Sequence, residues 1–154
     1  MMRAARNAGH AVWVIEQPAL YAAAHGVCAE AAHLEISGND ARWYQEIARD
    51  ALPLHDFSAV LMRKDPPFDM EYVTTTWLLE RAEAEGARVF NRPAALRDHS
   101  EKLAILEFPQ LTAPTLVARE AAPIQAFIDA QQDCVLKPLD GMGGSQVIFF
   151  LFGV

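Results

Sequence analysis

A lysine followed by a glycine-rich turn, near residue 140, is the part of the sequence most suited to chemistry. Lys137 follows the apolar run 134–136, and Gly141, Gly143 and Gly144 come shortly after it. Glycines let backbone N–H groups approach an oxyanion closely, and a lysine adds a compact positive charge for phosphate. The pattern indicates either a nucleotide-phosphate site or a plain hairpin turn with a surface lysine, because glycine turns are common after strands. It matches neither the P-loop nor the dinucleotide-binding fingerprint.

Two further cationic positions have weaker local signals. Arg63 and Lys64 follow the apolar run 59–62, which is typical of a buried parallel strand. Ligands of open α/β sheets bind outside the carboxyl ends of strands, and an arginine can grip a carboxylate through two parallel hydrogen bonds. The alternative is a solvated loop whose charges neutralise one another. Lys102 has the spacing of an ordinary exposed helix lysine.

Other kinds of site have little support in the sequence. The five histidines are scattered without an i, i+4 pair, so none is assigned to a metal or to base chemistry. Asp129, Asp133 and Asp140 are too dispersed to predict a magnesium cage. Only Cys28 and Cys134 occur, far apart, which favours a reducing cytosolic compartment over a disulfide framework or a structural zinc site.

The composition is that of a globular protein. The chain has 154 residues, of which 52% are hydrophobic and 21% charged, and its net charge is −7. An acidic chain without a basic cluster disfavours binding to nucleic acid, although a few placed cations can still hold a small anion. The apolar run 11–15 is too short for a signal-peptide core, and no stretch approaches the ~20 apolar residues of a membrane span. We expect a soluble protein without a membrane partner.

The first part of the chain reads as a mixed pattern of helices and strands. A helix tail over 1–8 ends at Gly9, which has the position of a C-cap, and a strand follows over 10–15. In a β-α-β unit a strand should precede this helix, so either the fold begins irregularly or the first strand has been lost. Residues 28–36 are interpreted as a short strand pair. Asn39 or Asp40 is expected to cap a helical turn that holds Trp43 and Tyr44.

A strand–helix–strand unit is predicted next. The strand 59–62 leads to a helix that is capped by Asp69, extends to about Glu85 and is closed by Gly86, after which 88–91 forms another strand. The sequence therefore predicts a three-layer α/β domain up to about residue 92. The helix is expected to bury a stripe with four members: Tyr72, Val73, Trp77 and Leu78.

The pattern changes from Pro93 onward. Asp98 is expected to cap a new helix, with Glu101 at the capping-box spacing. Further elements are predicted as a strand over 115–118, a helix over 122–131, a strand over 134–137 and a return strand over 146–152. Ending the chain inside that last hairpin would leave an apolar strand unpaired. We therefore interpret the sequence as a fragment.

Three stretches, 61–69, 91–103 and 136–144, together resemble one family. Their order and spacing are similar to those of bacterial glutathione synthetases, which are ATP-grasp carboxylate–amine ligases, and the resemblance covers nearly the whole chain. It implies an α/β fold in which 1–92 form a Rossmann-like pre-ATP-grasp domain with a parallel sheet, truncated at its start. It implies that 93–154 begin the α+β ATP-grasp domain, truncated at its end.

The resemblance also implies an activity and its residues. Members of the family join γ-glutamylcysteine to glycine with ATP and Mg²⁺ through an acyl phosphate, are cytoplasmic, and are expected to form homo-oligomers at full length. Lys102 and Lys137 match the two lysines that contact the ATP phosphates. Arg63 matches a basic residue in the loop that faces the γ-glutamylcysteine pocket. The small glycine loop that closes over the nucleotide is matched by Asp140, Gly141, Met142, Gly143 and Gly144.

The sequence also departs from the family pattern. The nucleotide lid, the adenine pocket and the acidic Mg²⁺ ligands are expected outside this chain, and residues 145–152 lack the arginine that usually follows the loop. A shifted reading frame or a mis-assembled end would explain this drift. We expect the isolated chain to be inactive as a ligase. Two alternatives stay open, a non-catalytic α/β binding module and an ATP-grasp ligase that uses another amino acid.

Overall fold

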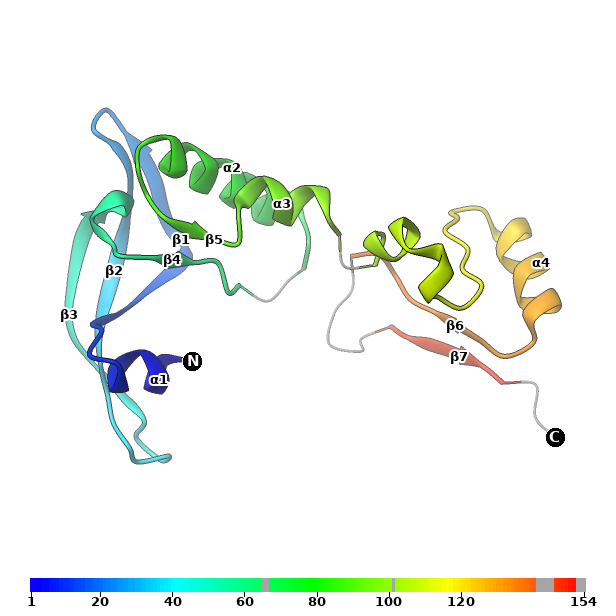
Figure 1. Cartoon of the computed structure of the whole chain (residues 1–154), viewed down its shortest axis with the longest axis horizontal. Coiled ribbons are helices and arrows are strands. Elements are labelled where there is room, and N and C mark those ends of the chain that lie inside the picture. The colour runs from blue at the N-terminus through cyan, green and yellow to red at the C-terminus, as the bar shows by residue number, and fades with distance from the viewer. Residues whose placement is uncertain (65–66, 101, 141–145, 152–154) are drawn as a thin grey trace.

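A three-stranded antiparallel sheet forms the largest element of the computed structural model, which describes residues 1–64, 67–100, 102–140 and 146–151 (Figure 1). Its strands are β1 (Val12–Ala23), β2 (Gly26–Ile36) and β3 (Tyr44–Pro53), in that order across the sheet. The short helix α1 (Met2–Asn7) precedes it. The strand predicted over 10–15 is therefore confirmed but is much longer, because β2 pairs with it over 12–15 and again over 20–23, with a register shift between them.

The helical turn predicted around Trp43 and Tyr44 is wrong. Tyr44 opens β3 and pairs with Ile36 of β2. Asn39, expected to cap that turn, instead accepts a hydrogen bond from the backbone N–H of Ala41 at 2.9 Å, which closes an Asx-type turn between the strands. The backbone N–H and C=O groups along this edge of β2 need hydrogen-bond partners. Pairing with β3 supplies them, and it outweighs the local preference of Asn39 or Asp40 to cap a helical turn.

The strand–helix–strand unit is confirmed. Strand β4 (Val60–Leu61) pairs in parallel with β5 (Val89–Phe90), and α2 (Met70–Ala84) connects them. A 3-10 turn, η1 (Leu54–Asp56), joins β3 to β4. The chain is thus a mixed α/β protein with a parallel pair beside its antiparallel sheet.

Helix α2 begins where the sequence predicts. The Asp69 carboxylate accepts a hydrogen bond from the backbone N–H of Tyr72 at 2.8 Å, as an N-cap does. The predicted buried stripe is only partly right, because Trp77 is 52% exposed. The buried residues follow an i, i+4, i+7 spacing, which fits one face of a helix better than the predicted set. They are Tyr72, Thr76, Leu79 and Ala82.

The main core lies between α2 and the sheet. Val27 and Ala29 of β2, Leu54 of η1, Leu79 of α2 and Val89 of β5 all belong to one buried cluster. Burying apolar side chains from both sheets and the helix in a single cluster fixes the parallel pair beside the larger sheet. This packing holds the carboxyl end of β4 in a defined place.

After residue 98 the last part of the chain forms a separate group of elements, whereas the helix before it lies against α2 (Figure 1). After β5, the chain continues as α3 (Pro93–Asp98), two 3-10 turns η2 (Ala104–Glu107) and η3 (Pro109–Leu111), α4 (Ala121–Gln131), β6 (Cys134–Leu136) and β7 (Ile148–Phe150). Strands β6 and β7 pair antiparallel, so the predicted helix over 122–131 and the predicted return strand are confirmed.

Two predictions for this part are wrong. Asp98 ends helix α3 instead of capping a new helix, because Pro93 at the first turn already starts the helix five residues earlier. Glu101, its expected partner, lies outside the described residues. The segment 115–118 forms no strand, since no neighbouring strand in the described part of the chain pairs with it.

Candidate functional site

The Lys102 ammonium lies against the backbone that follows Lys137. Its Nζ atom donates to the carbonyl oxygen of Pro138 at 2.6 Å and is 3.3 Å from that of Leu139. Lys102 is half-buried and comes just before η2, whereas Pro138 and Leu139 follow β6. Two segments 36 residues apart in sequence therefore meet at one point.

The β6–β7 hairpin decides where Lys137 and Asp140 lie. The pairing of Leu136 with Ile148 is the last rung of the ladder before the turn. Lys137 is the next residue along, and both Lys137 and Asp140 are exposed. The structure thus brings Lys102 and the Lys137–Asp140 segment to the same end of the hairpin. The other predicted loop residues, Gly141, Met142, Gly143 and Gly144, lie outside the described residues.

This arrangement could hold an anion. Cations fixed around a turn screen the charge of phosphate oxygens, and they do so most strongly where water is partly excluded. Lys102 is restrained by two carbonyl oxygens, while Lys137 is exposed at the mouth of the hairpin. The triphosphate of a nucleotide is a fitting ligand for such a pair of ammonium groups.

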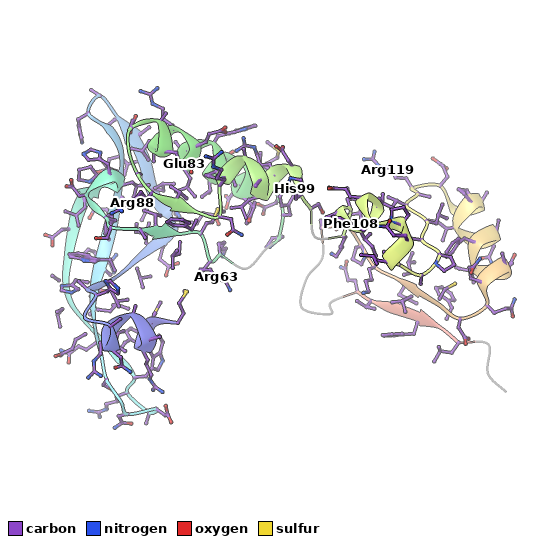
Figure 2. The ribbon with its side chains drawn as sticks, in the orientation of Figure 1. Arg63, Glu83, Arg88, His99, Phe108 and Arg119 are labelled. Carbon is purple, nitrogen blue, oxygen red and sulfur yellow. The ribbon has the colours of Figure 1, made fainter. Side chains whose placement is uncertain are left out.

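Arg63 belongs to a different part of the molecule. It follows β4, and Figure 2 shows it on the lobe that carries the antiparallel sheet. The backbone N–H of Met62 still donates to the carbonyl of Phe90 at 3.0 Å, so the parallel pairing continues almost to Arg63. Arg63 and Lys64 are both exposed at this carboxyl end. The position expected from the strand pattern is therefore the observed one.

The connection toward Lys102 depends on contacts that the sequence pattern did not reveal. Arg97 of α3 donates to the Thr76 hydroxyl at 3.1 Å and forms an ion pair with Glu80, both on α2. Thr76 is fully buried, and its hydroxyl donates to the carbonyl of Val73 at 2.6 Å. Nothing in the residue types marks these partners in advance. Thr76 is a buried polar residue on α2, but its burial became visible only in the folded structure.

Two shifted pKa values belong to the scaffold. The Glu85 carboxylate accepts hydrogen bonds from the backbone N–H of Val27 at 2.8 Å and from the Arg81 side chain at 2.7 Å. The bond from Val27, then that from Arg81, lowers the pKa of Glu85. Burial raises the pKa of Tyr72 at the start of α2. Glu85 therefore ties the end of α2 to the start of β2.

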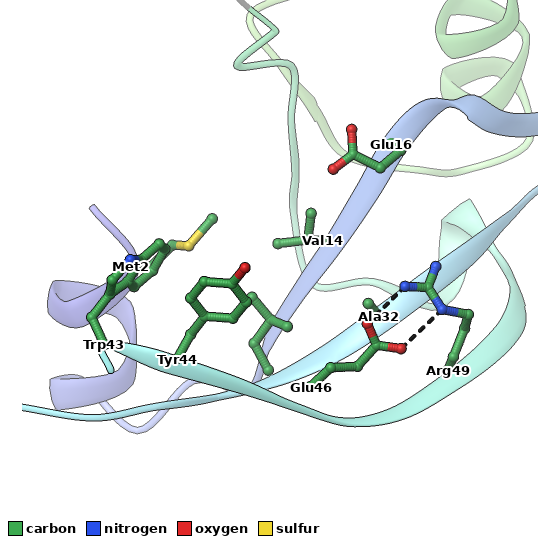
Figure 3. Close-up of a pocket in the computed structure, with 9 residues that line it drawn as sticks. Met2, Val14, Glu16, Ala32, Trp43, Tyr44, Glu46 and Arg49 are labelled. Carbon is green, nitrogen blue, oxygen red and sulfur yellow. Dashed lines mark hydrogen bonds and ion pairs between the residues drawn. The ribbon is translucent and has the colours of Figure 1, made fainter. Parts of the chain in front are cut away.

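A pocket lies on the other side of the sheet, between α1 and β3 (Figure 3). Its volume is about 240 Å³. Its arginine, Arg49, is held by Glu46 through hydrogen bonds of 2.9 and 2.7 Å, and this partner raises the pKa of Arg49. The remaining walls are mostly apolar and include Met2, Trp43 and Tyr44. None of the predicted site residues lines this pocket.

The described residues do not fit a magnesium ion. No group of three or more histidine, cysteine, aspartate or glutamate side chains in these ranges could hold a metal. Magnesium needs oxygen ligands in a nearly octahedral arrangement, and Asp140 stands alone at the mouth of the hairpin as the predicted site carboxylate. No helix among the described residues is long and apolar enough to cross a membrane.

Comparison with protein families decides the relationship. Residues 1–97 match the model described as "Prokaryotic glutathione synthetase, N-terminal domain", and residues 101–152 match "Prokaryotic glutathione synthetase, ATP-grasp domain". The chain belongs to the prokaryotic glutathione synthetase family. The resemblance stated from the three sequence stretches is thereby confirmed.

Individual relatives agree with this assignment. The chain is 52% identical over 147 residues to a glutathione synthetase of Ralstonia nicotianae, covering 96% of this chain and 45% of that protein. It is 51% identical over 154 residues to one of Bordetella pertussis, covering 96% and 48%. A glutathione synthetase of Pseudomonas aeruginosa is 43% identical, with 96% and 46% covered. The chain thus spans about half the length of these family members.

Proposed function

We propose that this chain supplies the peptide-facing and phosphate-binding half of an ATP-dependent ligase that joins γ-glutamylcysteine to glycine. The observation that carries the proposal is the meeting of Lys102 with the backbone just beyond Lys137, at the mouth of the β6–β7 hairpin. Membership in the glutathione synthetase family supports the choice of substrates.

Lys102 and Lys137 hold the phosphates of ATP in this proposal. Bound ATP supplies the phosphoryl group that activates the γ-glutamylcysteine carboxylate as an acyl phosphate. The two reacting groups are both anionic, so the ammonium groups of the lysines lower their mutual repulsion. Asp140, Gly141, Met142, Gly143 and Gly144 are the other nucleotide-binding residues in this proposal, by their match to the family's glycine loop.

The remaining assignments follow from the same family. Residues 1–92 form the pre-ATP-grasp domain, in which Arg63 faces the peptide substrate, and 93–154 begin the ATP-grasp domain. Magnesium is bound by family residues other than those described in this chain. The complete protein works in the cytoplasm as a homo-oligomer on small-molecule substrates. An ATP-grasp ligase that joins another amino acid would have the same phosphate site. Assays of the complete protein with glycine and with other amino acids distinguish that activity from glutathione synthesis.

Nucleotide binding by the 154-residue chain tests the phosphate site. Replacing Lys137 with alanine removes a charge-assisted hydrogen bond, which contributes ~1.5–3 kcal/mol, so ATP affinity should fall about tenfold or more. Lys64→Ala is the matched control, since Lys64 is an exposed lysine on the other lobe. Titration calorimetry with ATP measures both variants. An ATP affinity unchanged by Lys137→Ala would favour the non-catalytic binding module.

Catalysis by the same chain tests the second part of the proposal. We expect no ligase turnover from these 154 residues alone, because they span under half of the Ralstonia nicotianae enzyme. The assay couples ADP release to γ-glutamylcysteine and glycine. Steady ADP formation that requires both substrates would show that this half is sufficient and would contradict the expectation.

A further inference from the structure

A second arginine follows the other strand of the parallel pair, at the same carboxyl edge as Arg63. Leu61 of β4 pairs with Phe90 of β5, and each arginine comes two residues after its strand's paired residue: Arg63 after Leu61, and Arg92 after Phe90. The bond from the Met62 N–H to the Phe90 carbonyl, 3.0 Å long, belongs to this Leu61–Phe90 rung. The backbone therefore brings two guanidinium-bearing residues to neighbouring positions on one sheet edge.

Both arginines are available for a ligand. Arg63 and Arg92 are exposed, and neither forms an ion pair or a side-chain hydrogen bond with any described residue. Arg49, Arg81 and Arg97, by contrast, are each held by a glutamate. Two guanidinium groups without an ion-pair partner among the described residues repel each other when they are close, and an anion between them relieves that repulsion.

The Asp69 carboxylate has another task in this region. Its Oδ1 atom accepts the Tyr72 backbone N–H at 2.8 Å and so caps α2. The helix dipole favours a carboxylate at this helix end. Among the described residues that directly follow β4 and β5, the positive charges are those of Arg63, Lys64 and Arg92.

We propose that Arg92 is a substrate-binding residue that, together with Arg63, grips a carboxylate of the dipeptide substrate. The planar guanidinium group matches a carboxylate through two parallel hydrogen bonds, and two such groups side by side select a ligand with at least one free carboxylate. The carboxyl edge of a parallel pair is also where ligands of open α/β sheets bind. The choice of γ-glutamylcysteine as the ligand depends on the function proposed above.

The chain offers a matched control at the other end of the same strand. Arg88 is exposed and directly precedes β5, while Arg92 follows it. Figure 2 shows Arg88 and Arg63 toward opposite ends of the parallel pair. Arg88→Ala and Arg92→Ala therefore remove the same charge from the same strand, and only the second removes it from the proposed site.

The test is a titration of the ¹⁵N-labelled 154-residue chain with γ-glutamylcysteine in the absence of nucleotide. We expect saturable shifts of the backbone amides of Arg63, Lys64 and Asn91. Arg92→Ala should weaken binding about tenfold, as the loss of a charged hydrogen bond does, and Arg88→Ala should change it less than twofold. Arg92→Lys should give an intermediate affinity, because lysine keeps the charge and loses the planar fork.

Several results would overturn this assignment. Equal weakening by Arg88→Ala and Arg92→Ala would show only a general charge effect, and wild-type affinity in a folded Arg92→Ala variant would remove Arg92 from the site. Shifts that do not saturate, or that appear elsewhere in the spectrum, would reject the edge as a binding site. The dispersion of each variant's spectrum reports whether it is folded. Because no ATP is present, failure of the Lys137 experiment leaves this result unaffected, and the reverse also holds.

Discussion

The contact between Lys102 and the backbone after β6 predicts that this lysine organises the site before any ligand arrives. Lys102→Met removes the ammonium group and keeps most of the apolar stem. The stronger of the two contacts is 2.6 Å long, in the range of a charge-assisted hydrogen bond, and the weaker is 3.3 Å. The substitution therefore tests a restraint on the hairpin mouth that is independent of nucleotide.

The expected size follows from that geometry. A hydrogen bond to a charged group contributes ~1.5–3 kcal/mol. Lys102 is only half-buried, so water recovers part of the loss and the lower end applies. A cost of ~1.5 kcal/mol corresponds to about a tenfold increase in the opening of the β6–β7 hairpin next to Pro138.

Hydrogen exchange measures this opening directly. The backbone amides of β6 should exchange about tenfold faster in Lys102→Met than in the unchanged chain, in buffer without ATP. Lys64→Met is the control, and its β6 amides should keep their rates. Unchanged β6 exchange in Lys102→Met would refute the idea that the ammonium holds the hairpin mouth. It would leave Lys102 only a direct role toward phosphate.

Two predictions concern the scaffold. Leu54→Ala should lower the free energy of unfolding by ~2–5 kcal/mol, because Leu54 is fully buried in the main core. Leu61→Ala should lower it by well under ~2 kcal/mol, because Leu61 is 47% exposed. Urea denaturation measures both variants. The hydrogen bonds from Val27 and Arg81 lower the pKa of Glu85 below its ordinary value of 4.5. The contribution of Glu85 to stability is therefore complete above pH 4.5 and is lost as the pH falls through the lower pKa of the folded state. Thermal denaturation across the acid range should therefore show a shallower acid loss in Glu85→Gln, and an identical pH profile would contradict this role.

Local signals in the sequence predicted several elements correctly. Asp69 before an apolar-periodic segment predicted the start of α2, because a carboxylate at that position satisfies a free N–H group of the first turn. The apolar run at 59–62 and the short segment 88–91 predicted the parallel pair, and the glycine turn after Lys137 predicted a hairpin. The Asp69 cap and the hairpin are formed by residues close together in the sequence. The strands of the parallel pair could be recognised from their short apolar segments.

Other features required the folded chain. Tyr44 was expected in a helical turn and lies in β3, because the edge of β2 supplied the hydrogen-bond partners. Trp77 was expected in the core and is exposed, because the sheet selected the face with Thr76 and Leu79. Neither outcome can be read from neighbouring residues, since each depends on a surface formed by distant ones.

The candidate sites divide along the same line. Residue types and order were enough to place the chain in the glutathione synthetase family. The resemblance to that family then selected Arg63, Lys102 and Lys137, whose roles stay predictions. Only the tertiary structure seated the Lys102 ammonium on the carbonyl oxygens after β6 and put Arg92 at the same sheet edge as Arg63. Every residue has a backbone carbonyl group, so residue type does not show which carbonyls Lys102 will contact. The register of β4 against β5 likewise depends on two distant segments together. Such contacts exist only after the chain has folded.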